Sequence, residues 1–190
     1  MRNKLIVIVL VLFVSAFAMS FGPVFAQYNS STNPASIGAP VRSMIELGSV
    51  YSNIYDITIT VLETIRGKEA MGRLKMASPE NSTPAKGFEY ILARVKFEMK
   101  GRAVTDTLTF DLGNAPLQWV CLASDLTEYP KISVTVPEPP LIGTVKTGDS
   151  LEGWVAFAVD RKDSKPVMVF DPDSGGATGR GRTLFFKLYR

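Results

Sequence analysis

Apolar and polar residues alternate along much of the chain, and this period of two constrains the fold more than any other feature. It is clearest over 56–61, 91–99 and 151–159. In a β-strand such alternation places the apolar side chains on one face and the polar ones on the other. Strands are also predicted over 104–112, which we expect to form a hairpin with 91–99, and over 117–122, 132–136, 167–170 and 184–188.

One segment has a helical pattern instead. The apolar residues of 68–77 fall on one side of a 3.6-residue period, and Pro79 interrupts the pattern. A helix of ten residues is marginal by itself, so its apolar side must rest on a sheet. About eight strands, one short helix and no repeated strand–helix alternation predict an all-β fold, an antiparallel β-sandwich.

The first 26 residues have the pattern of an export signal. A basic start, Met1–Lys4, precedes an apolar run, and the small–bulky–small triplet 24–26 is a cleavage pattern for signal peptidase. We expect cleavage after Ala26 and a secreted, extracellular or cell-surface protein. The alternative, in which 5–25 is retained as a membrane anchor, stays open because that stretch is long enough to span a bilayer.

The remaining chain reads as a spacer followed by one domain. Residues 27–40 are rich in Ser, Asn, Pro and Gly and predict a flexible polar spacer before a single domain over 41–190. Asn29 and Asn81 each begin a glycosylation sequon. Whether either sequon is used depends on the host, and the sequence leaves this open.

The absence of histidine and the presence of a single cysteine exclude several kinds of catalytic and metal-binding site. The chain has no histidine, which excludes an imidazole base, a Ser-His-Asp triad and histidine metal ligands. Its one cysteine, Cys121, allows neither an intrachain disulfide nor a multi-thiolate zinc site. Cys121 lies in the apolar stretch 117–122, which favours burial in the core over pairing with another chain. We expect no cofactor.

The charge pattern argues against nucleic acid as a partner. Two of the 21 Lys and Arg lie in the first 26 residues, which leaves 19 against 18 acidic residues, a net charge of +1. Basic residues are interspersed with acidic ones, and no run of them could follow a phosphate backbone. The expected partner is a protein or another cell-envelope macromolecule, with membrane contact only through an uncleaved leader.

One loop resembles the start of a calcium site. Asp171 and Asp173 are two residues apart, as in loops where alternate oxygens converge on a hard cation. However, Gly175 replaces the third acidic residue, and Arg180 and Arg182 stand where a bidentate Glu is needed. We expect an Asx-type turn. A loop-carboxylate hydrolase or calcium-dependent protein that uses Asp171 and Asp173 remains the alternative function.

Other candidate sites are weaker. Glu46 with Asp56, and Asp125 with Glu128, are carboxylate pairs of the kind that general acid–base catalysis needs. Acidic residues at strand ends are usually solvated, so we expect no catalysis there. The glycine-rich stretch 175–181 has no following Lys-Ser/Thr pair or helix, so nucleotide binding is disfavoured.

Aromatic residues provide a further candidate. Trp119 and Trp154 lie in predicted strands, where such side chains more often fill the core than line a ligand groove. Tyr129 and Pro130, near Pro137–Pro140, form a cluster with Trp119. If this cluster is exposed, it has the character of a partner-binding patch.

Three segments together carry a family resemblance. They are Arg66–Ala70 (RGKEA), Gly87–Val95 (GFEYILARV) and Gly148–Val159 (GDSLEGWVAFAV). In this order the chain resembles a telokin-like, immunoglobulin-type domain of unknown function found in exported prokaryotic proteins, and the resemblance covers most of 37–188. The segment 78–80 departs from that pattern. The resemblance implies an immunoglobulin-like sandwich and an extracellular setting, and it supplies no catalytic residues.

These observations lead to one functional hypothesis. We expect an immunoglobulin-like antiparallel β-sandwich of about eight strands with one short inserted helix. Its function is expected to be that of a secreted or cell-surface interaction module without catalytic activity. An exposed edge strand, whose backbone groups can pair with a partner's strand, gives such a fold a route to binding.

Overall fold

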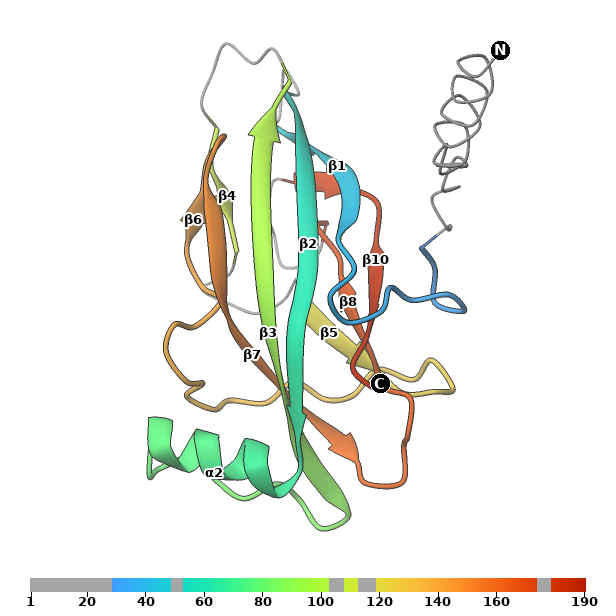
Figure 1. Ribbon diagram of the computed structural model, residues 1–190, viewed down its shortest axis with the longest axis vertical. Coiled ribbons are helices and arrows are strands. Elements are labelled where there is room, and N and C mark those ends of the chain that lie inside the picture. The colour runs from blue at the N-terminus through green and yellow to red at the C-terminus, as the bar shows by residue number, and fades with distance from the viewer. Residues whose placement is uncertain (1–28, 49–52, 103–107, 113–118, 174–178) are drawn as a thin grey trace, which may run out of the picture.

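The protein is mostly β, with antiparallel sheets and one short helix in its described part (Figure 1). The predicted signal peptide 1–26 lies outside the described residues. The computed structural model describes residues 29–48, 53–102, 108–112, 119–173 and 179–190.

The larger sheet has five antiparallel strands, in the spatial order β7-β3-β2-β1-β9. Its two long central strands follow the alternating sequence pattern, so one face is apolar along their length. A β-bulge between Val61 and Glu63 shifts the register where β2 approaches the helix. The strands are β1 (Val41–Leu47), β2 (Asn53–Arg66), β3 (Phe88–Gly101), β7 (Ser150–Asp160) and β9 (Gly179–Gly181).

A second, three-stranded sheet faces the first in the order β10-β8-β5. The short strands β4 and β6 pair with each other, and β3 pairs with β2 and β7. The expected hairpin between 91–99 and 104–112 is therefore wrong in the part that is described. The bounds are β4 (Phe110–Asp111), β5 (Trp119–Leu122), β6 (Thr144–Val145), β8 (Val167–Phe170) and β10 (Leu184–Lys187).

The main core lies between the two sheets. Phe97 of β3 contacts Phe110 and Phe170, with ring centroids 5.8 Å apart in both pairs. Trp119 of β5 packs on Phe170 at 4.8 Å. Burial of several such rings is among the largest apolar contributions that side chains make to folding. These contacts show that alternate side chains of the two sheets meet in one interior.

The predicted helix is confirmed as α2 (Lys68–Ala77). It packs on the opposite face of the large sheet, where Ala70 and Leu74 are buried against a cluster that includes Tyr90 and Leu92. The end of the sheet near α2 is therefore covered on both faces. Within the described residues, no helix is long and apolar enough to cross a membrane.

The strand expected over 132–136 is not formed. These residues alternate between half-buried and exposed, and Ile132, Val134 and Val136 pack against the apolar cluster beneath α2. Their backbone joins no sheet, because the segment crosses beside the edge of β7 before the prolines at 137, 139 and 140 turn it away. We call residues 129–142 the strap.

The segment 29–40 differs from the flexible spacer that its composition predicted. Its backbone follows β10: Ala35 N–H donates to Phe185 O (2.9 Å), and Lys187 N–H donates to Ala35 O (2.8 Å). The Asn29 side chain pairs with both backbone groups of Phe185. The polar composition does not predict this arrangement, because the segment is held mainly by backbone hydrogen bonds, and these require no apolar residues.

Candidate functional site

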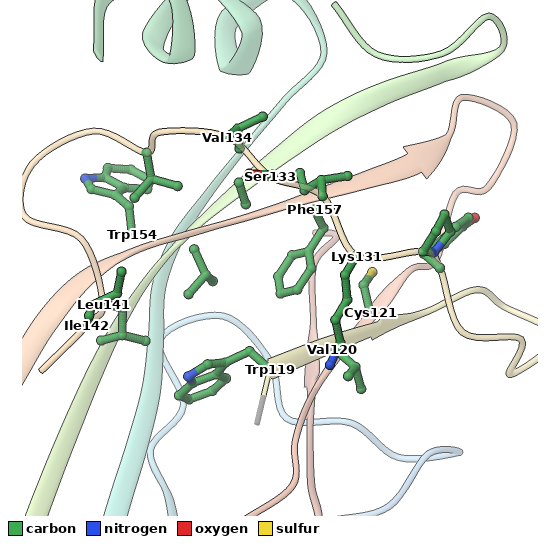
Figure 2. A pocket seen from close by; sticks show the side chains of 16 residues that line it. Trp119, Val120, Cys121, Lys131, Ser133, Val134, Leu141, Ile142, Trp154 and Phe157 are labelled. Carbon is green, nitrogen blue, oxygen red and sulfur yellow. The ribbon is translucent and has the colours of Figure 1, made fainter. Parts of the chain in front are cut away.

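An apolar pocket lies where the two sheets are open to each other. Strands β7 and β5 are the edges of their respective sheets, and the strap passes across the space between them. The pocket between the strap and these edges has a volume of about 210 Å³. Figure 2 shows the side chains of Trp119, Trp154 and Phe157 arranged around it.

The lining of this pocket is aromatic and aliphatic, with Lys131 as its one charged residue among those described. Trp119 and Trp154 are almost fully buried, but only Trp119 lies in the core between the sheets, as expected. Trp154 lies in the apolar cluster on the α2 face, and both tryptophans line the pocket. Apolar linings with few polar groups are typical of binding sites. The remaining lining residues include Cys121, Tyr129, Ile132, Val134, Leu141, Ile142 and Phe157.

The strap is fixed at both ends. At its start, Tyr129 N–H donates to Cys121 O (2.8 Å), and the Tyr129 hydroxyl donates to the Asp163 carboxylate (2.8 Å). At its end, Leu141 N–H donates to Trp154 O (3.0 Å), and Trp154 N–H donates to Pro139 O (2.9 Å). The strap therefore closes onto β5 at one end and onto the β7 edge at the other.

A buried amide fixes the middle of the strap. Asn81 is 5% exposed, and its side chain donates to Leu74 O and Thr135 O, each at 2.7 Å. Its carbonyl oxygen accepts from Thr135 N–H at 2.7 Å. One side chain thus joins the last turn of α2 to the strap. Both of its amide hydrogens donate a hydrogen bond, and its carbonyl oxygen accepts one of the two that it can accept.

Gly153 allows the strap to meet β7. A Cβ atom on Gly153 would lie 2.4 Å from the backbone carbon of Pro140 and 2.5 Å from Leu141 N. Real Cβ atoms do not approach backbone so closely, so only glycine fits beneath this crossing. This close approach gives a structural reason for the glycine in the EGWV sequence of β7.

The Asp163 carboxylate organises the first end of the strap. It accepts hydrogen bonds from Ser124 Oγ (2.8 Å), the Tyr129 hydroxyl (2.8 Å) and Lys165 N–H (3.0 Å). Partial burial acts to raise the pKa of Asp163, but these hydrogen bonds outweigh it, and the pKa lies below its usual value. Burial and the bond to Asp163 raise the pKa of Tyr129 to about 12.

We predict that Asp163→Asn destabilises the protein by about 1 kcal/mol at neutral pH. The effect is modest because Asp163 is only partly buried, so water screens its interactions. Because the folded-state pKa is depressed, the contribution of Asp163 is present above the unfolded-state pKa of about 3.9 and is lost as pH falls through the folded-state value. Urea unfolding of both proteins between about pH 7 and pH 2 measures this. The difference should shrink below about pH 4; a difference independent of pH would contradict the assignment.

Cys121 is buried, as its apolar sequence context predicted. It is 2% exposed, and burial, followed by the nearby Asp163 charge, raises the pKa of its thiol. The thiolate is the reactive form of cysteine, so this environment makes the side chain a poor nucleophile. Cys121 contributes apolar surface to the pocket.

Asp171 and Asp173 form the expected Asx-type turn. The Asp171 carboxylate accepts from Asp173 N–H at 3.2 Å, and that of Asp173 accepts from Gly181 N–H at 3.2 Å. The described part of 175–181 is Gly179–Gly181, which forms β9 against β1. Among the described residues, no group of three or more His, Cys, Asp or Glu side chains could hold a metal ion.

One aspartate of each carboxylate pair is held by hydrogen bonds within the fold. Glu46 and Asp56 line one shallow hollow, but Asp56 accepts two hydrogen bonds from Arg102, which hold its pKa below its usual value. Asp125 accepts from Thr127 N–H at 3.0 Å, which lowers its pKa. A general acid needs a raised pKa.

The sequon asparagines both have structural roles. The Asn29 amide nitrogen donates to Phe185 O, and that of Asn81 donates to both Leu74 O and Thr135 O. A glycan on Asn81 would therefore replace one of its two donated hydrogen bonds. Sequence reasoning identified Asn81 only as a sequon. Asn81 lies in a polar stretch that includes Pro79 and Pro84, and nothing in that local sequence predicts that its side chain is buried.

Comparisons with known proteins assign no family. No protein-family model matches the chain, and no curated protein matches it. Among solved structures, the chain is similar to ycdA of Bacillus subtilis subsp. subtilis str. 168, provisionally described as a lipoprotein, with 14% identity and a TM-score of 0.45. The likeness covers 69% of this chain and 36% of that one. The chain thus spans about a third of that protein's length, and the relation to a telokin-like family remains a prediction.

Proposed function

We propose that this protein is an exported, non-enzymatic interaction module that binds an apolar group of its partner in the pocket beneath the strap. The observation that carries the proposal is the pocket itself: aromatic and aliphatic side chains from two sheet edges enclose about 210 Å³. The export pattern of residues 1–26 supports an extracellular or cell-surface setting.

The size of the pocket favours one side chain over a whole small molecule. Sites for drug-sized ligands enclose about 300–1,000 Å³, whereas an apolar cavity of about 150 Å³ holds a benzene molecule. A pocket of about 210 Å³ therefore suits one aromatic or branched aliphatic group. Anchoring by one large side chain in a desolvated pocket is how macromolecular interfaces gain much of their affinity.

The immunoglobulin-like relationship belongs to this proposal as well. The three segments that carry the resemblance form the β2–α2 junction, the start of β3 and all of β7 except its last residue. Arg66 and Glu89, from the first two segments, form an ion pair at 2.5 Å. Two facing antiparallel sheets are compatible with the resemblance, and an immunoglobulin-type sandwich is the fold that we propose.

Two matched substitutions test the site. We predict that Ile142→Asp weakens binding of benzyl alcohol about tenfold, because it places a carboxylate at the mouth of an apolar pocket. Leu126→Asp is the control, since Leu126 is 52% exposed against 50% for Ile142 and does not line the pocket. Its positive φ also suits Asp. Ligand-observed NMR titration gives the dissociation constants, and equal values for the two variants would contradict the proposal.

A further inference from the structure

A second surface lies at the edge of the large sheet opposite to the pocket. There β1, β2 and β9 carry the shallow hollow described above, with a volume of about 750 Å³. Its residues alternate along the strands with buried residues of the main core, such as Ile45 and Tyr55, so it faces away from that core. Four arginines and two carboxylates line it: Arg42, Arg102, Arg180, Arg182, Glu46 and Asp56.

The helix leaves this part of the sheet face uncovered. α2 packs on the same face, but at the far end of β2, where Ile65 belongs to its apolar cluster. Ile65 is nine residues from Asp56, or about 30 Å along an extended strand. Figure 1 shows α2 beside the lower end of β2 and β1 beside its upper part. The hollow is therefore open to a partner.

Strand register places two apolar side chains among these charges. Met44 of β1 pairs with Asp56 of β2. Glu46 pairs with Ile54 on one side and with Arg180 of β9 on the other. Residues paired in this way have Cβ atoms about 4.5–5.5 Å apart. Met44 and Ile54 are 48% and 41% exposed, so an apolar centre lies open between charged neighbours.

Two of the arginines are held in place by the fold. Arg102 donates two hydrogen bonds to the Asp56 carboxylate, at 2.8 and 2.6 Å. Arg182 Nη2 donates to Asn29 O at 2.5 Å. A guanidinium group has five N–H donors, so an arginine bonded within the fold can still donate to a partner's carboxylate. Side chains that are already ordered lose less entropy on binding.

The hollow concentrates the positive charge of the chain. Its four arginines and two carboxylates give it a net charge of +2. Residues 27–190 contain 19 basic and 18 acidic residues, so outside the hollow 15 basic residues stand against 16 acidic ones. Electrostatic complementarity therefore calls for an anionic partner at this face.

A protein fits this surface better than a bilayer or a second copy of the chain. Met and Arg are enriched at protein interfaces. A bilayer of anionic lipids is flat, and its phosphates would meet Glu46 as well as the arginines. A symmetric contact with a second copy would bring together two hollows that each carry a net charge of +2.

We infer that this hollow is a second docking surface, which binds an acidic segment of a partner protein. Carboxylates of the segment pair with the guanidinium groups, and an apolar side chain between them packs on Met44 and Ile54. The inference goes beyond the proposed function and does not depend on it. The hollow shares no lining residue with the pocket beneath the strap.

Two short peptides of opposite charge test the inference on the mature protein. Each has eight residues of Gly and Ser with blocked ends and Leu at the fourth position, flanked by two Glu in one peptide and two Lys in the other. We expect the Glu peptide to bind about tenfold more tightly. NMR titration of the ¹⁵N-labelled protein gives the dissociation constants. Raising the salt from about 0.05 M to about 0.5 M should remove most of the preference.

Matched variants locate the binding. Arg42→Glu should abolish the Glu/Lys preference, whereas Lys86→Glu, an exposed control outside the hollow with the same change of charge, should keep it. Met44→Ser should remove the advantage of Leu over Ser at the fourth peptide position, which we expect to be about threefold. Met76→Ser, at an 80% exposed position on α2, should leave that advantage intact.

Several results would overturn the inference. They are a failure of both peptides to bind, and a Glu/Lys preference that Arg42→Glu leaves unchanged. Capture by phosphatidylglycerol vesicles without peptide binding would assign the hollow to anionic lipid instead. A dimer that Arg42→Glu dissociates would assign it to a second copy. None of these results bears on the pocket, which benzyl alcohol tests separately.

Discussion

Replacing Gly153 with alanine is expected to destabilise the protein by about 3 kcal/mol. The added Cβ would overlap the backbone of Pro140 and Leu141, which has no flexible end that could move aside. The strap must then lift from β7, which breaks the two backbone hydrogen bonds at Trp154. Urea or thermal unfolding of the purified domain measures the loss, and the same change should open the pocket.

Gly72→Ala is the matched control for that substitution. Gly72 lies in α2, is exposed, and a Cβ there would meet nothing within 4 Å. Alanine favours a helix over glycine by about 0.5–1 kcal/mol, so this variant should be slightly more stable than the wild type. If Gly153→Ala unfolds at the same urea concentration as the wild type, the strap does not cross β7 as described.

Removal of the Asn81 side chain should have an effect of similar size. Asn81→Ala is expected to destabilise the protein by about 3 kcal/mol, because three hydrogen bonds are lost and buried backbone groups are left unpaired. The loss should loosen both the last turn of α2 and the middle of the strap. Unfolding titrations and amide hydrogen exchange at Thr135 would measure the two effects.

Thr83→Ala separates this structural role from glycosylation. It destroys the same sequon but leaves Asn81 and its hydrogen bonds in place, and Thr83 is exposed. Its stability should match the wild type within about 0.5 kcal/mol. If Thr83→Ala were as destabilising as Asn81→Ala, the role of the Asn81 amide would be wrong.

Local sequence patterns predicted the elements whose own residues determine them. The helix over 68–77 has an apolar stripe and a following proline, and it forms over those residues. The strands at 167–170 and 184–187 likewise follow from their alternation or apolar content. In each of these segments, the apolar pattern of the sequence corresponds to the side chains that are buried.

The strap shows where such patterns fail. Residues 132–136 alternate in burial as a strand would, because their even-numbered side chains pack on the cluster beneath α2. Pairing is decided by distant partners, and here the partners are one side chain, Asn81, and one crossing at Gly153. Neither contact can be read from the strap's own residues.

The pocket was only partly foreseen for the same reason. Sequence reasoning grouped Trp119, Tyr129 and Pro130 as a patch that would bind a partner if exposed. The structure places all three at the pocket, but Trp119 is buried in its wall. Trp154 joins them from β7, since the topology brings the edges of two sheets together.

The two tryptophans allow one direct test of whether the pocket admits an apolar group. The chain contains only two, and both line the pocket, so a ¹⁵N-labelled protein gives two indole N–H signals that report on it. Titration with benzyl alcohol should shift both signals with saturation near millimolar concentration, on the order of 4 kcal/mol of binding free energy. Indole signals that stay fixed while others move would show that the apolar group binds elsewhere.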